Sequence, residues 1–170
     1  GLHEVERVCR MGMARRFGEV EGSFAVLGMG KLGGRELNYS SDIDLVFLYG
    51  EEGPHRGSMT RGDYFTRLAE GILTAFQTTH PAGPLFRVDL RLRPEGDTGA
   101  LVRSLESMEN YYAAFGETWE RMALIKARGV CGDPETVYEF EHRLQPFIYP
   151  RVVSADLVQE IAAVKRRIEN

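Results

Sequence analysis

The sequence has 170 residues, of which 43% are hydrophobic and 27% are charged, and its formal net charge is −4. This size fits one globular domain, or one domain with an appendage. The charge does not indicate a basic surface for nucleic acid, and no apolar run approaches the roughly 20 residues that span a bilayer. We therefore expect a cytoplasmic protein that binds neither nucleic acid nor membrane. The chain has no initial Met and its end resembles the middle of a helix, so we expect a piece of a longer protein.

The first part of the chain predicts helices and strands in alternation. Apolar side chains recur at helical spacing over Glu4–Phe17, whereas the short apolar run Phe24–Gly28 predicts a buried strand. A second strand is expected over Asp42–Tyr49. A helix is expected to begin at Thr60, which can cap it, and to end near Thr78.

The second part predicts one more strand and then helices. Phe86–Arg93 alternates apolar and polar side chains, which predicts a strand ended by Pro94. The remaining segments predict helices over 104–116 and 119–128, after the N-cap Asp133, and after the N-cap Ser154. The class is thus α+β, or α/β with a small sheet. We expect residues 1–103 to form a core with the sheet and the chemistry, and residues 104–170 to form a helical portion.

Two carboxylates open the second strand. Asp42 and Asp44 are two residues apart, so on a strand they share a face and lie a few ångströms from each other. Like charges at that distance need a cation, and oxygen ligands suit Mg²⁺. If the strand with Asp89 neighbours this one, three carboxylates could hold two Mg²⁺ ions for in-line displacement at phosphorus. Without metal, Asp89 would form salt bridges with the arginines beside it.

A glycine-rich segment precedes these acids. Residues 28–33, with the sequence GMGKLG, match the dinucleotide-binding pattern G-x-G-x-x-G, which alone is a weak signal. The stretch from Gly33 to Ser41 is short for the crossover of a parallel βαβ unit, and a dinucleotide site gives no reason for the acid pair. We therefore favour a turn that approaches phosphate closely, with Lys31 beside it.

Several cationic side chains are candidates for phosphate binding. Arg91 and Arg93 can donate two hydrogen bonds to one phosphate, although a solvated strand face is an equal alternative. A second group on the helix over 119–128 could line the far wall of a cleft or simply face solvent: Glu120, Arg121, Lys126 and Arg128.

Three segments together resemble a known family. Residues 28–45, 86–94 and 119–128 are similar to the signature of glutamine synthetase adenylyltransferase, a member of the DNA polymerase β-like nucleotidyltransferase superfamily. The resemblance extends from about Phe24 to Arg151. It implies the α+β fold of that superfamily, with a small mixed sheet flanked by helices. It also implies that the catalytic residues Asp42, Asp44 and Asp89 hold two Mg²⁺ ions, for which Mn²⁺ can substitute. It implies that the glycine turn holds the nucleotide phosphates, and the candidate phosphate- and nucleotide-binding residues are thus Gly30, Lys31, Gly33, Gly34, Ser41, Arg91 and Arg93.

The family enzyme has two similar catalytic domains. One removes AMP from glutamine synthetase by phosphorolysis and releases ADP, and the other adds AMP from ATP. Residues 38–41 (NYSS) and 119–121 (WER) resemble the AMP-removing copy. The resemblance thus implies glutamine synthetase as protein substrate, a PII-type signalling protein as partner, and a role in nitrogen regulation. The adenylylating half and a non-catalytic nucleotide-binding regulatory module are the alternatives.

Overall fold

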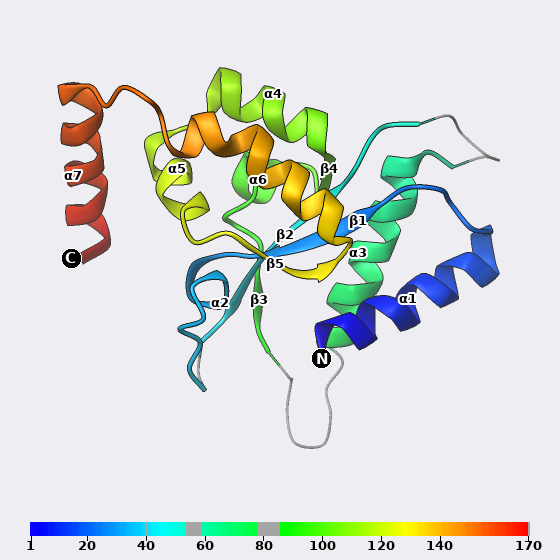
Figure 1. The fold of residues 1–170 in the computed structure, drawn as a ribbon. Coiled ribbons are helices and arrows are strands. Elements are labelled where there is room, and N and C mark those ends of the chain that lie inside the picture. Colours follow the sequence, from blue (N-terminus) through cyan, green and yellow to red (C-terminus); the bar gives the residue numbers. More distant parts are fainter. Residues whose placement is uncertain (40, 54–58, 78–85, 170) are drawn as a thin grey trace.

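The structure is a computed structural model that describes residues 1–39, 41–53, 59–77 and 86–169. Helices surround a small mixed sheet (Figure 1), which confirms the α+β class. The helices of the described residues are α1 (Leu2–Phe17), α2 (Gly30–Gly33), α3 (Arg61–Gln77), α4 (Leu105–Phe115), α5 (Thr118–Leu124), α6 (Pro134–Ile148) and α7 (Ala155–Glu169), with a 3₁₀ turn at Gly96–Thr98. The strands are β1 (Phe24–Gly28), β2 (Ile43–Tyr49), β3 (Val88–Asp89), β4 (Val102–Ser104) and β5 (Arg128–Gly132). Among these residues, no helix is both long and apolar enough to cross a bilayer.

The sheet has β2 near its centre. Its order is β3-β2-β1-β5. β3 pairs with the start of β2, and β4 pairs with the end of β2. β1 and β2 are antiparallel, with Gly28 opposite Leu45, whereas β3 and β4 run parallel to β2. Because β1 and β2 are antiparallel, the glycine-rich turn between them does not belong to a parallel βαβ unit. The dinucleotide-binding alternative is therefore wrong.

Two layers of helices cover the two faces of the sheet. The alternation along β2 divides its side chains: Leu45 and Phe47 pack with α3 on one face, and Val46 and Leu48 pack with α4 and α6 on the other. Figure 1 shows α1 and α3 on one side and α4 and α6 on the opposite side. Both faces of β1 and β2 are thus buried, which explains why these strands consist almost entirely of apolar residues.

The caps expected from the sequence begin the helices. Thr60 Oγ1 accepts a hydrogen bond from the Asp63 N–H (2.8 Å), and Ser104, Asp133 and Ser154 accept from the residue three positions later. Each contact satisfies an N–H group that has no partner within its helix. The four helices predicted after these caps are therefore confirmed, although Thr78 lies outside the described residues.

Two expectations are wrong. The strand predicted over 86–93 is a strand only at Val88–Asp89, because Asp89 Oδ1 accepts the Arg91 N–H (2.9 Å) and a turn follows. The second half is not helical throughout, since α5 ends at Leu124 and β5 pairs with β1. The division at residues 103 and 104 stays a prediction, with β5 now known to join the later part of the chain to the sheet.

Candidate active site

The edge between β2 and β3 brings two of the predicted acids together. Asp44 and Asp89 are direct partners across these parallel strands, one position after the pair of Ile43 and Val88. The Ile43 N–H donates to the Arg87 carbonyl (2.9 Å), which fixes the register just before the acids. Asp42 immediately precedes β2. Asp89 therefore lies on a strand next to that of the acid pair, as the proposed three-carboxylate cluster requires.

The three carboxylates affect each other electrostatically. Burial raises the pKa of Asp44, and the negative charges of Asp89 and Asp42 raise it further. The pKa of Asp89 is lowered instead, mainly because Arg91 donates hydrogen bonds to its carboxylate. Asp44 thus lies where negative charge is least compensated.

Arginines hold the other two acids. Arg91 binds Asp89 through both Nε and Nη2, at 2.9 and 2.5 Å from Oδ2. Arg87 Nε lies 2.7 Å from Asp42 Oδ1. This oxygen is buried and accepts no hydrogen bond from any described residue, so the contact is an ion pair without hydrogen-bond geometry.

The glycine turn lies directly beside Asp44. The Met29 N–H donates to the Asp44 carbonyl (2.9 Å), which extends the β1–β2 pairing into the turn. Gly30 has φ +50°, and a Cβ atom there would lie 2.6 Å from Asp44 Oδ2. Glycine therefore suits this position, because it adopts a positive φ freely and leaves the Asp44 carboxylate where it is.

The far side of the turn rests on the segment that leads into β5. A Cβ atom on Gly33 would lie 1.9 Å from the Lys126 carbonyl oxygen. Arg128 Nε and Nη2 donate to the carbonyls of Gly33 and Leu32, both at 3.1 Å. Lys126 Nζ also pairs with Glu36 (2.8 Å). These cations brace the glycine turn, a role that sequence reasoning missed because it assigned Arg128 to a helix.

The other phosphate-binding candidates have different surroundings. Lys31 is exposed on the one-turn helix α2, and Gly34 follows it in helical conformation. Ser41 Oγ donates to the Asn38 side chain, while Ser40 between them lies outside the described residues. Arg93 is 11% exposed and donates to the carbonyls of Leu90 and Asp97. Arg93 thus stabilises the turn after β3, and its contact with phosphate stays a prediction.

The Trp-Glu-Arg segment has a structural role in the described chain. Glu120 is 2% exposed. Its carboxylate accepts hydrogen bonds from the Glu117 N–H (2.9 Å) and the Tyr111 hydroxyl (3.0 Å), and burial raises its pKa. Arg121 lies over the Phe147 ring, 4.8 Å from its centre. Glu120 therefore caps α5 and ties it to α4.

The donor set suits a divalent cation, although its members are not gathered around one point. Asp42, Asp44 and Asp89 offer hard oxygen ligands, and one of these oxygens, Asp42 Oδ1, is buried without a hydrogen bond. Within the ranges described, no three acidic, histidine or cysteine side chains form a cluster able to hold a metal ion. Two of the three acids are engaged by arginines instead. The chemistry of these residues therefore fits Mg²⁺, while the Mg²⁺ site itself stays a prediction.

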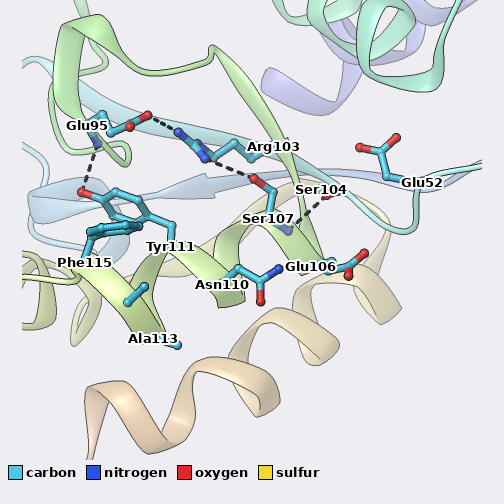
Figure 2. Close-up of a pocket in the computed structure, with 11 residues that line it drawn as sticks. Glu52, Glu95, Arg103, Ser104, Glu106, Ser107, Asn110, Tyr111, Ala113 and Phe115 are labelled. Carbon is cyan, nitrogen blue, oxygen red and sulfur yellow. Dashed lines mark hydrogen bonds and ion pairs between the residues drawn. The ribbon is translucent and has the colours of Figure 1, made fainter.

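A cavity of about 770 Å³ lies apart from the acids, along α4. Figure 2 shows Arg103 at its wall, between the side chains of Glu95 and Ser107, with Tyr111 below. The Arg103 guanidinium lies over the Tyr111 ring, 5.4 Å from its centre. Several polar side chains that line the cavity thus bind each other, and none of the three acids lines it. The chemistry is better assigned to the β2–β3 edge.

The mixed sheet, its flanking helices and the acids on adjacent strands are consistent with the polymerase β-like nucleotidyltransferase fold. A family model described as glutamate-ammonia ligase adenylyltransferase matches residues 3–143. The chain belongs to this family.

Similar curated proteins point to the same family. Proteins from Methylococcus capsulatus, Nitrosococcus oceani and Aromatoleum aromaticum are 46%, 45% and 40% identical over 94%, 89% and 95% of this chain. Each is named bifunctional glutamine synthetase adenylyltransferase/adenylyl-removing enzyme. The matched regions cover only 17%, 16% and 18% of those proteins, so this chain spans about a sixth of their length.

Proposed function

We propose that this chain is a Mg²⁺-dependent nucleotidyltransferase domain that removes AMP from adenylylated glutamine synthetase by phosphorolysis and releases ADP. The observation that carries the proposal is the pairing of Asp44 with Asp89 beside a glycine turn that touches Asp44. The names of the relatives supply the substrate, and the likeness of residues 38–41 to the AMP-removing copy supplies the direction. A PII-type signalling protein as partner, a cytoplasmic location and a role in nitrogen regulation belong to the same proposal.

The reaction needs charge neutralisation and positioning more than covalent help from the protein. A phosphate oxygen forms a bond to the phosphorus of the tyrosyl-AMP group while the bond from phosphorus to the tyrosine oxygen breaks. The tyrosine oxygen then takes up a proton, and ADP leaves. Mg²⁺ held by Asp42, Asp44 and Asp89 would offset the negative charge of the phosphates.

The chain's own residues supply the positioning. The glycine turn lets the backbone approach the nucleotide phosphates next to Asp44, and the braces from Arg128 keep the turn in place. Lys31 and Arg91 are the cations that can orient the attacking phosphate.

The two directions of the reaction differ in their need for a base. In the adenylylating direction a tyrosine hydroxyl must lose its proton, and Asp89 would be the base. Phosphate is already an anion and needs no such base.

The test is incubation of the chain with AMP-modified glutamine synthetase, Mg²⁺ and phosphate. We expect ADP to form, to require phosphate, and to disappear in the Asp44→Asn and Asp89→Asn variants. AMP addition from ATP to the unmodified substrate would identify the adenylylating half instead. Nucleotide binding without turnover in either direction would favour the regulatory module.

A further inference from the structure

Two arginines occupy the carboxylates that the proposed function assigns to metal. Arg87 and Arg91 lie two residues before and two residues after Asp89. Arg87 pairs with Asp42 at 2.7 Å, and Arg91 pairs with Asp89 at 2.5 Å. Each of these two acids thus has its own cation from the segment around β3, and both cations lie at the β2–β3 edge.

These arginines are held on the solvent side. The Arg87 and Arg91 side chains are 77% and 73% exposed, whereas those of their partners Asp42 and Asp89 are 43% and 16% exposed. An ion pair whose cation faces water is usually worth about 1 kcal/mol, and somewhat more where the arginine binds through two nitrogens, as Arg91 does on Asp89. A divalent cation with direct carboxylate ligands can therefore replace such contacts at little cost.

Asp44 makes the replacement favourable. Asp44 lies opposite Asp89 across the two strands and two residues after Asp42, so a cation at this edge meets a third carboxylate. A guanidinium group is planar and spreads its charge over several donors, whereas a divalent cation carries twice the charge in one point. The same planar group suits the oxygens of a phosphate better than an ammonium does.

We propose that Arg87 and Arg91 are exchangeable counter-cations of the acid cluster: a divalent cation replaces them on Asp42 and Asp89, and the freed guanidinium groups bind the substrate's phosphate. This inference rests on the metal site of the proposed function. It adds Arg87 to the residues that bind phosphate. It also has Arg91 bind Asp89 before the metal is present and phosphate afterwards.

The proposal predicts opposite effects on two ligands, which a purely structural role does not. We would measure Mn²⁺ binding by electron paramagnetic resonance, without nucleotide, and then ADP binding by calorimetry in saturating Mn²⁺. The variants are Arg87→Gln and Arg91→Gln. The matched control is Arg7→Gln, because Arg7 is also exposed and paired with a carboxylate, that of Glu4 in α1.

We expect each of the two variants to bind Mn²⁺ about two- to fivefold more tightly than the parent chain. We expect ADP to bind about tenfold more weakly or worse, because a hydrogen bond to a charged group is lost. The control should change neither affinity. Unchanged or weaker Mn²⁺ binding in both variants would overturn the proposal.

An Asp44→Asn variant separates this failure from failure of the proposed function. If Asp44→Asn weakens Mn²⁺ binding while the arginine variants leave it unchanged, the metal site stands and only the exchange is refuted. If the parent chain does not bind Mn²⁺, or Asp44→Asn has no effect on it, both proposals fail.

Discussion

The contact between the glycine turn and the segment before β5 gives the most direct test of how the site is positioned. We predict that Gly33→Ala destabilises the fold and that Gly34→Ala, one residue later, does not. A Cβ atom on Gly33 would lie 1.9 Å from the Lys126 carbonyl oxygen and 2.5 Å from the Gly28 carbonyl oxygen. Both are backbone atoms, so no side-chain rotation can relieve the overlap.

The size of the effect follows from that overlap. Ordinary contact begins at 3.4 Å, so the turn and the segment near Lys126 must separate by more than 1 Å. Overpacking of this kind costs about 1–3 kcal/mol, which lowers the melting temperature of a domain of this size by about 2–12 °C. The shift also strains the two hydrogen bonds that Arg128 donates to the turn.

Gly34 is a matched control within the same turn. Its added Cβ would lie 3.3 Å from the Glu36 side chain and from the Gly30 carbonyl oxygen, and its φ of −73° suits any residue. The assay is thermal and urea denaturation of the parent and the two variants, followed by Mn²⁺ binding. Equal stability of the two variants would refute the close contact between the turn and the segment before β5.

Three further predictions concern single carboxylates. Asp44→Asn should raise the free energy of unfolding at pH 7 by about 0.5–2 kcal/mol and abolish divalent-ion binding. Because the native pKa of Asp44 is raised, its ionised carboxylate lowers stability once the pH rises through that pKa, and the gain of the Asn variant should vanish in acid. A gain in melting temperature that persists below pH 3.8 would contradict the assignment. Asp133→Ala should cost about 1 kcal/mol in urea denaturation by removing the α6 cap, whereas Asp133→Asn should keep it. The pKa of Asp133 is lowered, so the parent should lose this contribution as pH falls below 3.8, and equal acid sensitivity of the Asn variant would argue against the cap. Glu120→Ala should cost about 1–3 kcal/mol in urea denaturation, because it leaves the Tyr111 hydroxyl without its acceptor, and Glu120→Gln should recover most of that loss.

The elements that could be predicted from the sequence are those with local signals. β1 and β2 are buried on both faces, and their unbroken apolar runs follow directly from that burial. The caps at Ser104 and Asp133 act within three residues of themselves, so their helices were predictable from residue type and spacing.

The elements that could not be predicted depend on distant partners or on competing contacts. β5 is a strand because it pairs with β1, about a hundred residues earlier, and its sequence carries two glycines that disfavour a strand. The strand predicted from Phe86 is interrupted because the Asp89 side chain takes the Arg91 N–H. Beyond that turn, Leu90 and Leu92 pack in different cores, so the apparent apolar face does not exist as one surface.

The residues of the candidate site likewise include some that the sequence indicates locally and some whose contacts depend on distant partners. The sequence singled out the acids as candidates, because they lie two residues apart at the start of a buried strand, and the structure places Asp44 opposite Asp89; their binding of metal stays a prediction. The partner of each arginine could not be predicted, since the same alternation equally suits contact with phosphate or with a neighbouring carboxylate. A surface that binds both a divalent cation and phosphate must carry charges of both signs a few ångströms apart, and such charges pair with each other. Under the proposed function, the ion pairs of Arg87 and Arg91 are the pairing that such charges adopt before metal and phosphate bind.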